Sequence, residues 1–298
     1  MFALPYPQSL PDWLTQYWNI ALGRKAQVRR DSWLFGPMGE IGGVGEKIIE
    51  QIAKAEGLRV VRSASPAGLL PSADAFGALT RDLHPDIIAF YTQTSEFEME
   101  AWTKWQPFWG AFGRLVDRMF ARRIDQLRLP SDSLETSRGM TSEVVLFIAQ
   151  NGEVRYRLWL RKLVATGAIV YSGFYSGVVG DFECPRIKVV FPLPKGSATV
   201  VMLMSVDALG RLRLSSHGTK DGDSGFYFLV EDRKKRVWIN YLKSFQEFID
   251  VYLDSTGELR ADHTMRLWGR LVYSLHYKMK RRANPEGSAN GPDRLSLT

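Results

Sequence analysis

The residues able to do acid–base chemistry are few in this sequence. Four histidines occur among its 298 residues, and two of them, His217 and His263, stand near carboxylates in the chain. Histidine exchanges a proton near neutral pH, so it is the usual general base in a reaction without a metal. The candidate catalytic set is therefore His217, Asp223 and His263.

Both candidate regions also have a simpler structural interpretation. The tetrapeptide Gly222-Asp223-Ser224-Gly225 copies the sequence around a chymotrypsin-like nucleophile, but the flanking residues do not continue that pattern, and these residue types favour a turn between strands. Asp262 and His263 are neighbours on a predicted strand, so their side chains must point to opposite faces. The alternative to catalysis at His263 is thus a cross-strand polar pair on the solvent-facing side of a sheet.

Metal ligands are scarce as well. The single cysteine, Cys184, excludes a disulfide within the chain and argues against a cysteine-based zinc or iron–sulfur site. Two histidines with a carboxylate would suffice for an open iron or zinc site, and Asp221-x-Asp223-x-Gly225 imitates the start of a calcium loop. Phe226 stands where that loop needs glycine. We therefore assign no metal and no cofactor.

A glycine-rich stretch, residues 36–45, precedes a predicted helix, and a helix N-terminus attracts anions. A phosphate-binding loop of the Walker type needs lysine after its last glycine, whereas Glu46 follows here and would repel phosphate. A dinucleotide-binding loop needs a strand before it, and residues 32–35 make a poor strand. We interpret the stretch as a connection, with anion binding as the open alternative.

Aromatic side chains form the candidate ligand-binding set. Trp102, Trp105, Trp109 and Phe112 recur at spacings of three and four, which predicts one face of a helix. Packed beneath a sheet, such a face would either be ordinary core or line a cavity for an apolar molecule.

Positive charge is concentrated in two segments, residues 114–128 and 278–282, which together carry the whole net charge of +7. Such clusters can contact anionic lipid, and they can equally be a solvated helix face and a cation-rich helix end. We predict at most a weak, salt-sensitive contact with an anionic membrane surface. No nucleic-acid-binding motif occurs, so nucleic acid is not an expected partner. The residues of this candidate contact are Arg114, Arg118, Arg122, Lys278, Lys280, Arg281 and Arg282.

The elements that must position these residues change character along the chain. Apolar residues at helical spacing predict helices in the first half and one at the C-terminal end, over 12–22, 46–56, 85–93, 97–105, 108–127 and 271–282. Between them, segments rich in β-branched and aromatic residues predict antiparallel strands, because their short turns leave no room for helical crossovers. These strands are expected at 144–148, 154–160, 168–175, 187–191, 198–206, 209–214, 226–230, 237–242, 248–253 and 259–267.

The expected fold class is therefore α+β, with a mostly helical N-terminal half and a large antiparallel sheet closed by a C-terminal helix. The helical region is expected to cover residues 1–135, and the sheet with its closing helix residues 140–282. Residues 283–298 are rich in Asn, Pro, Gly and Ser and are expected to be disordered.

Two resemblances accompany this layout. Residues 140–282 resemble START-like helix-grip proteins in having a long sheet followed by a helix, which implies a ligand cavity between the two. The segments 136–143, 258–264 and 275–277 resemble those of uncharacterised bacterial proteins. That second resemblance implies no activity, and it assigns no functional residue.

Composition is that of a folded globular protein, with 45% apolar residues and a mean hydropathy of −0.17. The sequence has no signal-peptide pattern and no uninterrupted apolar stretch long enough for a membrane span, so a cytoplasmic location is expected. Our leading prediction is a binding module for an apolar or amphipathic small molecule held between the sheet and the Trp-rich helices. The alternatives are a small-molecule enzyme that uses His217 or His263 with nearby carboxylates, and a peripheral membrane or scaffold protein that uses the basic helices.

Overall fold

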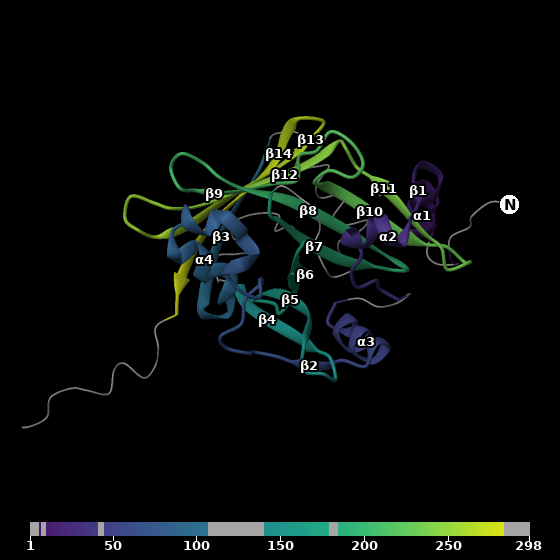
Figure 1. Ribbon diagram of the computed structural model, residues 1–298, viewed down its shortest axis with the longest axis horizontal. Coiled ribbons are helices and arrows are strands. Elements are labelled where there is room, and N and C mark those ends of the chain that lie inside the picture. The colour runs from purple at the N-terminus through teal and green to yellow at the C-terminus, as the bar shows by residue number, and fades with distance from the viewer. Residues whose placement is uncertain (1–5, 7–9, 41–44, 107–139, 179–183, 283–298) are drawn as a thin grey trace, which may run out of the picture.

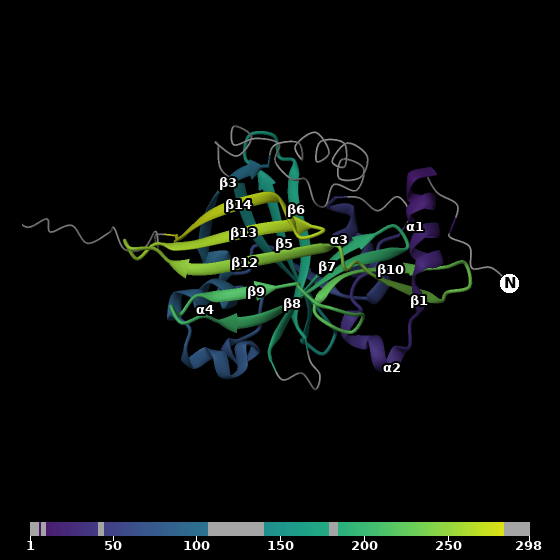
Figure 2. The same ribbon diagram turned by 90° about the horizontal axis from the view of Figure 1, so that it is seen from above.

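A closed antiparallel β-barrel is the centre of the computed structural model, which describes residues 6, 10–40, 45–106, 140–178 and 184–282 (Figure 1). Within those ranges, ten strands form a ring in the order β8-β7-β6-β5-β4-β3-β14-β13-β12-β9, and the pairing of β9 with β8 closes it. Figure 2 shows β14, β13, β12 and β9 side by side in this order. The ring strands are β3 (Phe97–Trp105), β4 (Met140–Ile148), β5 (Val154–Leu163), β6 (Ile169–Gly177), β7 (Arg186–Leu193), β8 (Gly196–Val206), β9 (Leu212–Ser215), β12 (Phe245–Leu253), β13 (Leu259–Leu267) and β14 (Arg270–Arg281).

Further strands extend the barrel wall on both sides. Strands β10 (Gly225–Glu231), β11 (Val237–Tyr241) and β1 (Arg24–Lys25) continue outward from β8, and β2 (Arg59–Val61) pairs with β4. The helices are α1 (Leu10–Leu22), α2 (Val28–Asp31), α3 (Lys47–Glu56) and α4 (Pro85–Thr92), with the short 3₁₀ helices η1 (Ser32–Leu34), η2 (Ala73–Arg81) and η3 (Thr94–Glu96).

Alternation of apolar and polar side chains gives the barrel its two faces. In β3, Phe97, Met99 and Ala101 are buried, whereas Glu98 and Glu100 between them are exposed. On the outer face of β4, β5 and β6, helix α3 packs through isoleucines at helical spacing against an apolar cluster (Figure 1). That cluster contains Ile48, Ile49, Ile52, Val145, Phe147, Leu158, Leu160, Phe174 and Val190.

One end of the barrel is closed by the segment that contains η2 and α4. Leu70, Phe76 and Ile87 are buried there, in one apolar cluster with buried residues of nine ring strands. Phe90 stands edge-on to Trp159 of β5, with ring centroids 6.1 Å apart. The segment therefore covers this end of the barrel. Its apolar side chains are buried against those of the strands, as in two packed layers.

The expected α+β fold with a helical first half and a closing C-terminal helix is wrong. Helices do form near three of the predicted positions, at α1, α3 and α4, but residues 97–105 and 270–281 are barrel strands. Strand β14 pairs with β3 along nine residues, so two segments expected as separate helices form one ladder in the wall. The START-like layout, which needs a C-terminal helix, is therefore not found. The predicted helix over 108–127 and the predicted disordered tail lie outside the described residues.

The predicted antiparallel strands between residues 143 and 267 are confirmed. Each one corresponds to a strand from β4 to β13, and every pairing between named strands in the described chain is antiparallel. Their short turns use glycine at positive φ, as at Gly152, Gly210 and Gly257, where other residues would be strained. The error of the sequence-based fold lies in the first and last strands of the barrel and not in its middle.

A partly buried ion-pair network fastens the N-terminal segment to the loop before β10. The Asp31 carboxylate is 1% exposed and accepts hydrogen bonds from Arg24 at 2.6 and 2.8 Å and from the Gln27 amide at 2.8 Å. The same Arg24 guanidinium donates to Asp221. Burial by itself raises the pKa of Asp31, but the hydrogen bonds from Arg24 and Gln27 outweigh it and hold the pKa below its ordinary value.

We expect Asp31→Asn to lower the free energy of unfolding by about 1–3 kcal/mol near neutral pH, because Arg24 loses a charged acceptor in a buried site. Since the pKa of Asp31 is lower in the folded chain, this contribution is complete above the ordinary value of 3.8 and is lost as the pH falls through the folded-state value. Urea unfolding at several pH values should therefore show the wild type and the variant converging in acid.

The matched control is Asp250→Asn, which breaks the cross-strand pair between Asp250 and Arg213 on the outside of the barrel. That pair is more exposed, so its loss should cost about 0–1 kcal/mol. Equal losses in the two variants would contradict the structural role given to Asp31.

Candidate functional site

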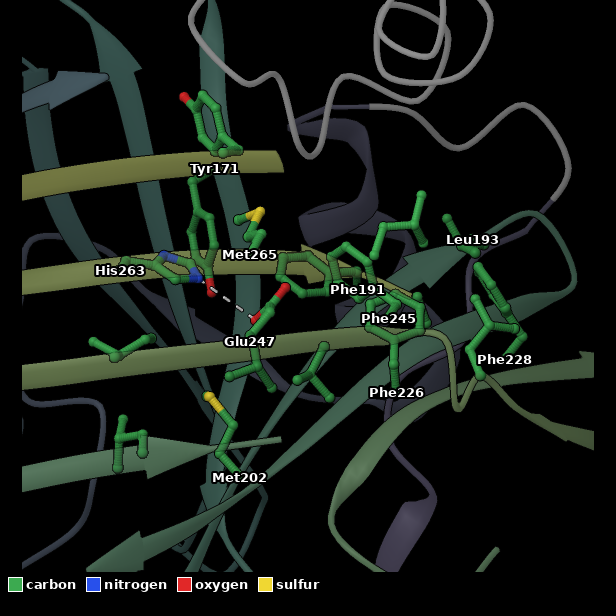
Figure 3. A pocket seen from close by; sticks show the side chains of 18 of the residues that line it. Tyr171, Phe191, Leu193, Met202, Phe226, Phe228, Phe245, Glu247, His263 and Met265 are labelled. Carbon is green, nitrogen blue, oxygen red and sulfur yellow. Dashed lines mark ion pairs between the residues drawn. The ribbon is translucent and has the colours of Figure 1, made fainter. Parts of the chain in front are cut away.

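The barrel contains a cavity of about 1090 Å³. Its wall is built mostly from apolar and aromatic side chains that project inward from the ring strands, and Phe226 and Phe228 of β10 extend it beyond the ring (Figure 3). Leu69, Phe90 and Tyr91 form its floor at the plugged end. Representative wall residues are Phe191, Val200, Met202, Leu214, Phe245, Ile249 and Met265.

The sequence leaves this space open in two ways. A ring of ten strands is wider than the eight that side chains can fill, and small residues such as Ala198 and Ala261 stand on the inner face. At Gly173, an added Cβ would lie 2.9 Å from the Tyr171 hydroxyl and 2.9 Å from Cγ1 of Val189. Glycine at this position therefore lets Tyr171 lie across the inner face of β6.

An acid and a base face one another inside the cavity. Oε2 of Glu247 on β12 lies 3.8 Å from Nε2 of His263 on β13, and both side chains are 13% exposed (Figure 3). They come from neighbouring strands at diagonal register positions, since Glu247 is opposite Met265 and His263 is opposite Ile249. Nε2 of His263 is buried and makes no hydrogen bond within the described chain. A group on a bound molecule could therefore accept or donate a proton there.

Two tyrosines stand near this pair. The hydroxyls of Tyr171 and Tyr175 on β6 are 2.7 Å apart and share one hydrogen bond. Burial raises the pKa of both phenols well above the usual value, and the charge of Glu247 adds to the effect while that of Arg161 opposes it. Both phenols therefore stay protonated, so that the pair remains a hydrogen-bond donor toward the cavity.

The structure does not bring the three predicted catalytic residues together. His263 lines the cavity, whereas His217 is exposed and stacks on Phe248, with ring centroids 6.3 Å apart. Asp223 accepts hydrogen bonds from the backbone and hydroxyl of Thr219 and from the Lys220 amide, which organises the predicted turn before β10.

Asp262, the chain neighbour of His263, points to the other face of β13. It pairs with His276 at 2.7 Å, directly across from it on β14, and accepts a hydrogen bond from Tyr252. The two neighbours thus face opposite sides, as predicted from strand geometry. The cross-strand polar pair belongs to Asp262, and His263 belongs to the cavity.

The predicted aromatic set does not share one face, because its described members lie on opposite faces of a strand. Trp105, at the end of β3, lines the cavity and packs on Tyr273, with ring centroids 4.4 Å apart. Trp102 is on the opposite face of the same strand and is 43% exposed. The other two members, Trp109 and Phe112, lie outside the described residues.

Acidic neighbours pair with the basic residues at the end of β14. Lys278 and Lys280 contact Glu258, Arg281 lies 3.4 Å from Glu96, and Arg282 lies 4.0 Å from Glu98. The segment was expected to end a helix, but it is a strand, so a helix dipole does not explain its charge. Arg114, Arg118 and Arg122 lie outside the described residues.

The glycine-rich stretch contains no visible anion site in its described part. Gly39 approaches the Leu193 carbonyl so closely that an added Cβ would lie 2.9 Å from it. Glu46, at the start of α3, pairs with Arg62 at 2.8 Å and with Lys162 at 2.6 Å. Residues 41–44 lie outside the described residues, so anion binding there stays untested.

The polar residues that share the cavity with His263 were not predicted from the sequence. Arg161, Tyr171, Tyr175 and Glu247 all line it. The available signal was a polar residue on the inward phase of a strand, as in Trp159-x-Arg161, where alternation puts the guanidinium on the same face as a buried indole. The face of β5 that carries Arg161 can be recognised as the inner face only when the sheet is known to close into a barrel.

Among residues 6, 10–40, 45–106, 140–178 and 184–282, no three His, Cys, Asp or Glu side chains gather as metal ligands would. None of the helices in these same ranges has both the length and the apolar character needed to cross a bilayer.

The fold and the cavity together define a closed antiparallel barrel with an apolar interior and a few inward polar groups. No family model matches the chain, and no solved structure matches it. The chain is similar to the uncharacterized membrane protein YndJ of Bacillus subtilis (strain 168), with 26% identity over 238 residues. The aligned part covers 79% of this chain and 41% of that relative. As the sequence resemblance implied, a bacterial relative of uncharacterised function is found.

Proposed function

We propose that this protein binds an apolar or amphipathic small molecule inside the barrel. The observation that carries the proposal is the cavity of about 1090 Å³ with its mostly apolar lining. Sites for small organic molecules are concave and apolar with a few placed polar groups, and they typically occupy about 300–1000 Å³. The site thus lies within the ring of strands and not between a sheet and helices.

The energetics favour an occupant with a hydrocarbon part. Water in such a cavity finds few hydrogen-bond partners over most of the wall, because the lining is mostly apolar. Each methylene that moves from water to the apolar wall contributes about 0.8 kcal/mol. A chain molecule along the wall can therefore bind through burial alone.

Calorimetric titration with decan-1-ol tests the proposal. We expect saturable binding of one molecule per chain with a negative heat-capacity change, the sign that apolar surface is buried. Native mass spectrometry of the freshly purified protein should show a co-purified mass that decan-1-ol displaces. Absence of saturable binding would contradict the proposal.

A second candidate function is catalysis on the bound molecule, favoured by the pairing of His263 with Glu247 at 3.8 Å inside the cavity. In this hypothesis His263 exchanges a proton with the molecule, and Glu247 orients the imidazole. The co-purified molecule should then be changed over time by the wild type and recovered unchanged from His263→Gln. A molecule that both proteins leave unchanged would support binding without catalysis.

A role at a membrane surface has less support. The similar protein is named a membrane protein, but the described basic residues of β14 have acidic neighbours. A cytoplasmic location stays a prediction from the sequence.

A further inference from the structure

Arg161 is a buried cation on the cavity wall. It stands on β5, is 4% exposed, and its guanidinium carbon lies 5.0, 5.1 and 5.5 Å from the ring centroids of Trp159, Tyr277 and Tyr171. Three aromatic faces thus surround one guanidinium. Cation–π contacts of this kind hold the group in place and offset part of its cost of burial.

The N–H groups of Arg161 are nearly unused. Nη2 is 3.7 Å from Sδ of Met140, a weak acceptor, and Nε is buried without a hydrogen-bond partner in the described chain. A guanidinium has five N–H donors, and arginine is almost never fully buried unless an acceptor such as a carboxylate pairs with it. Arg161 therefore lacks the acceptor that its burial requires.

The carboxylate on this part of the wall does not supply that acceptor. Glu247 forms its ion pair with His263, and none of the ion pairs in the described chain includes Arg161. Beside Arg161, the hydroxyls of Tyr171 and Tyr175 share one hydrogen bond, so one of their two protons stays free. Donors without acceptors thus gather in one place on an otherwise apolar wall.

We propose that Arg161 binds a carboxylate on the molecule held in the barrel, with a free tyrosine hydroxyl as a further donor. The inference rests on the proposed function and names its ligand class, an amphipathic carboxylic acid whose hydrocarbon part lies along the apolar wall. A planar carboxylate matches the fork of the guanidinium, and its negative charge matches the positive charge of Arg161.

Titrations with decanoate and decan-1-ol at about pH 8, where a carboxylic acid is ionised, test this inference. In Arg161→Gln we expect affinity for decanoate to fall ~10- to 100-fold, the usual size for a charge-assisted hydrogen-bonded pair, while affinity for decan-1-ol changes less than about threefold. Retained decan-1-ol binding also shows that the variant is folded. The matched control is Arg266→Gln, an arginine that stacks on Phe248 outside the barrel and should leave both affinities unchanged.

A second measurement uses the wild type alone, so it tests the role of Arg161 even if the Arg161→Gln variant does not fold. Decyltrimethylammonium carries the same chain with the opposite charge, and it should bind at least about tenfold more weakly than decanoate. Equal affinity for the two ions, or an Arg161→Gln variant that keeps its decanoate affinity, would overturn the role of Arg161. A wild type that binds decan-1-ol but not decanoate would also overturn the role of Arg161. It would leave the proposed function intact. If the wild type bound none of the three ligands, both the role of Arg161 and the proposed function would be overturned.

Discussion

Replacing Phe147 with alanine is expected to lower the free energy of unfolding by about 3–5 kcal/mol. Phe147 is fully buried on the outer face of β4 and packs against Phe174 and Tyr156, with ring centroids 5.4 and 6.2 Å apart. It belongs to the cluster that attaches α3 to the barrel. The close packing leaves little freedom to collapse around the gap, so the variant loses both burial and dispersion contacts.

Urea unfolding followed by circular dichroism would measure this loss. The control is Leu209→Ala in the turn before β9, where the leucine is 78% exposed and the expected change is within about 0.5 kcal/mol. A loss for Phe147→Ala as small as that of the control would contradict the packing of α3 on the barrel.

Filling the cavity is expected to weaken ligand binding about 30-fold. Ile249 on β12 faces the cavity and is half-buried, so an indole in Ile249→Trp can extend into free space. The added ring displaces two or three methylenes of a chain ligand, which costs about 2 kcal/mol of binding free energy. Titration with decan-1-ol would measure the change, and overpacking should cost no more than about 1–3 kcal/mol of stability.

Phe248→Trp is the matched control for this substitution. Phe248 is the chain neighbour of Ile249 on the outer face, where it contacts His217 and Arg266. A larger ring there leaves the cavity untouched, so affinity should not change. If both tryptophan variants bound decan-1-ol as the wild type does, the ligand would not lie in the barrel.

The middle of the barrel could be predicted because its strands carry their own signals. Alternating apolar residues and turn glycines mark β4 to β13, and each of these strands has its neighbour in the sheet close by in sequence. Closure depends instead on β3 meeting β14, which is more than 160 residues away, and on β12 meeting β9 across the inserted strands β10 and β11. A local pattern carries no information about such distant pairings.

Two strands were mistaken for helices for separate reasons. In β3 the period-two pattern of Phe97, Met99 and Ala101 was present, but the tryptophans at spacings of three and four suggested a helix face. In β14 the residues from Val272 to Leu275 are buried consecutively, so the strand shows no clean alternation. Over these four residues both faces of β14 are buried, and such strand segments resemble buried helices in sequence.

The candidate site was predictable only in part, through His263. Histidine drew attention by its pKa range, and it does line the cavity. Arg161 and Glu247 were not singled out from the sequence, because their burial is a property of the closed ring and not of their neighbours in sequence. The residues that say most about the ligand are therefore the charged ones on the apolar wall, and they can be recognised only once the barrel is known.

Methyl NMR of protein labelled with carbon-13 at its methionines tests the central claim most directly. Of the nine methionines, Met99, Met202, Met265 and Met279 line the cavity, whereas Met38 packs outside it beside Leu34 and Tyr227. A ligand in the barrel is therefore expected to contact methyls of the first group. On saturation with decanoate, signals of this group should shift and show nuclear Overhauser contacts to the ligand chain, while Met38 stays unchanged. Contacts to Met38, or saturation that leaves all four lining methyls unchanged, would contradict a ligand site inside the barrel.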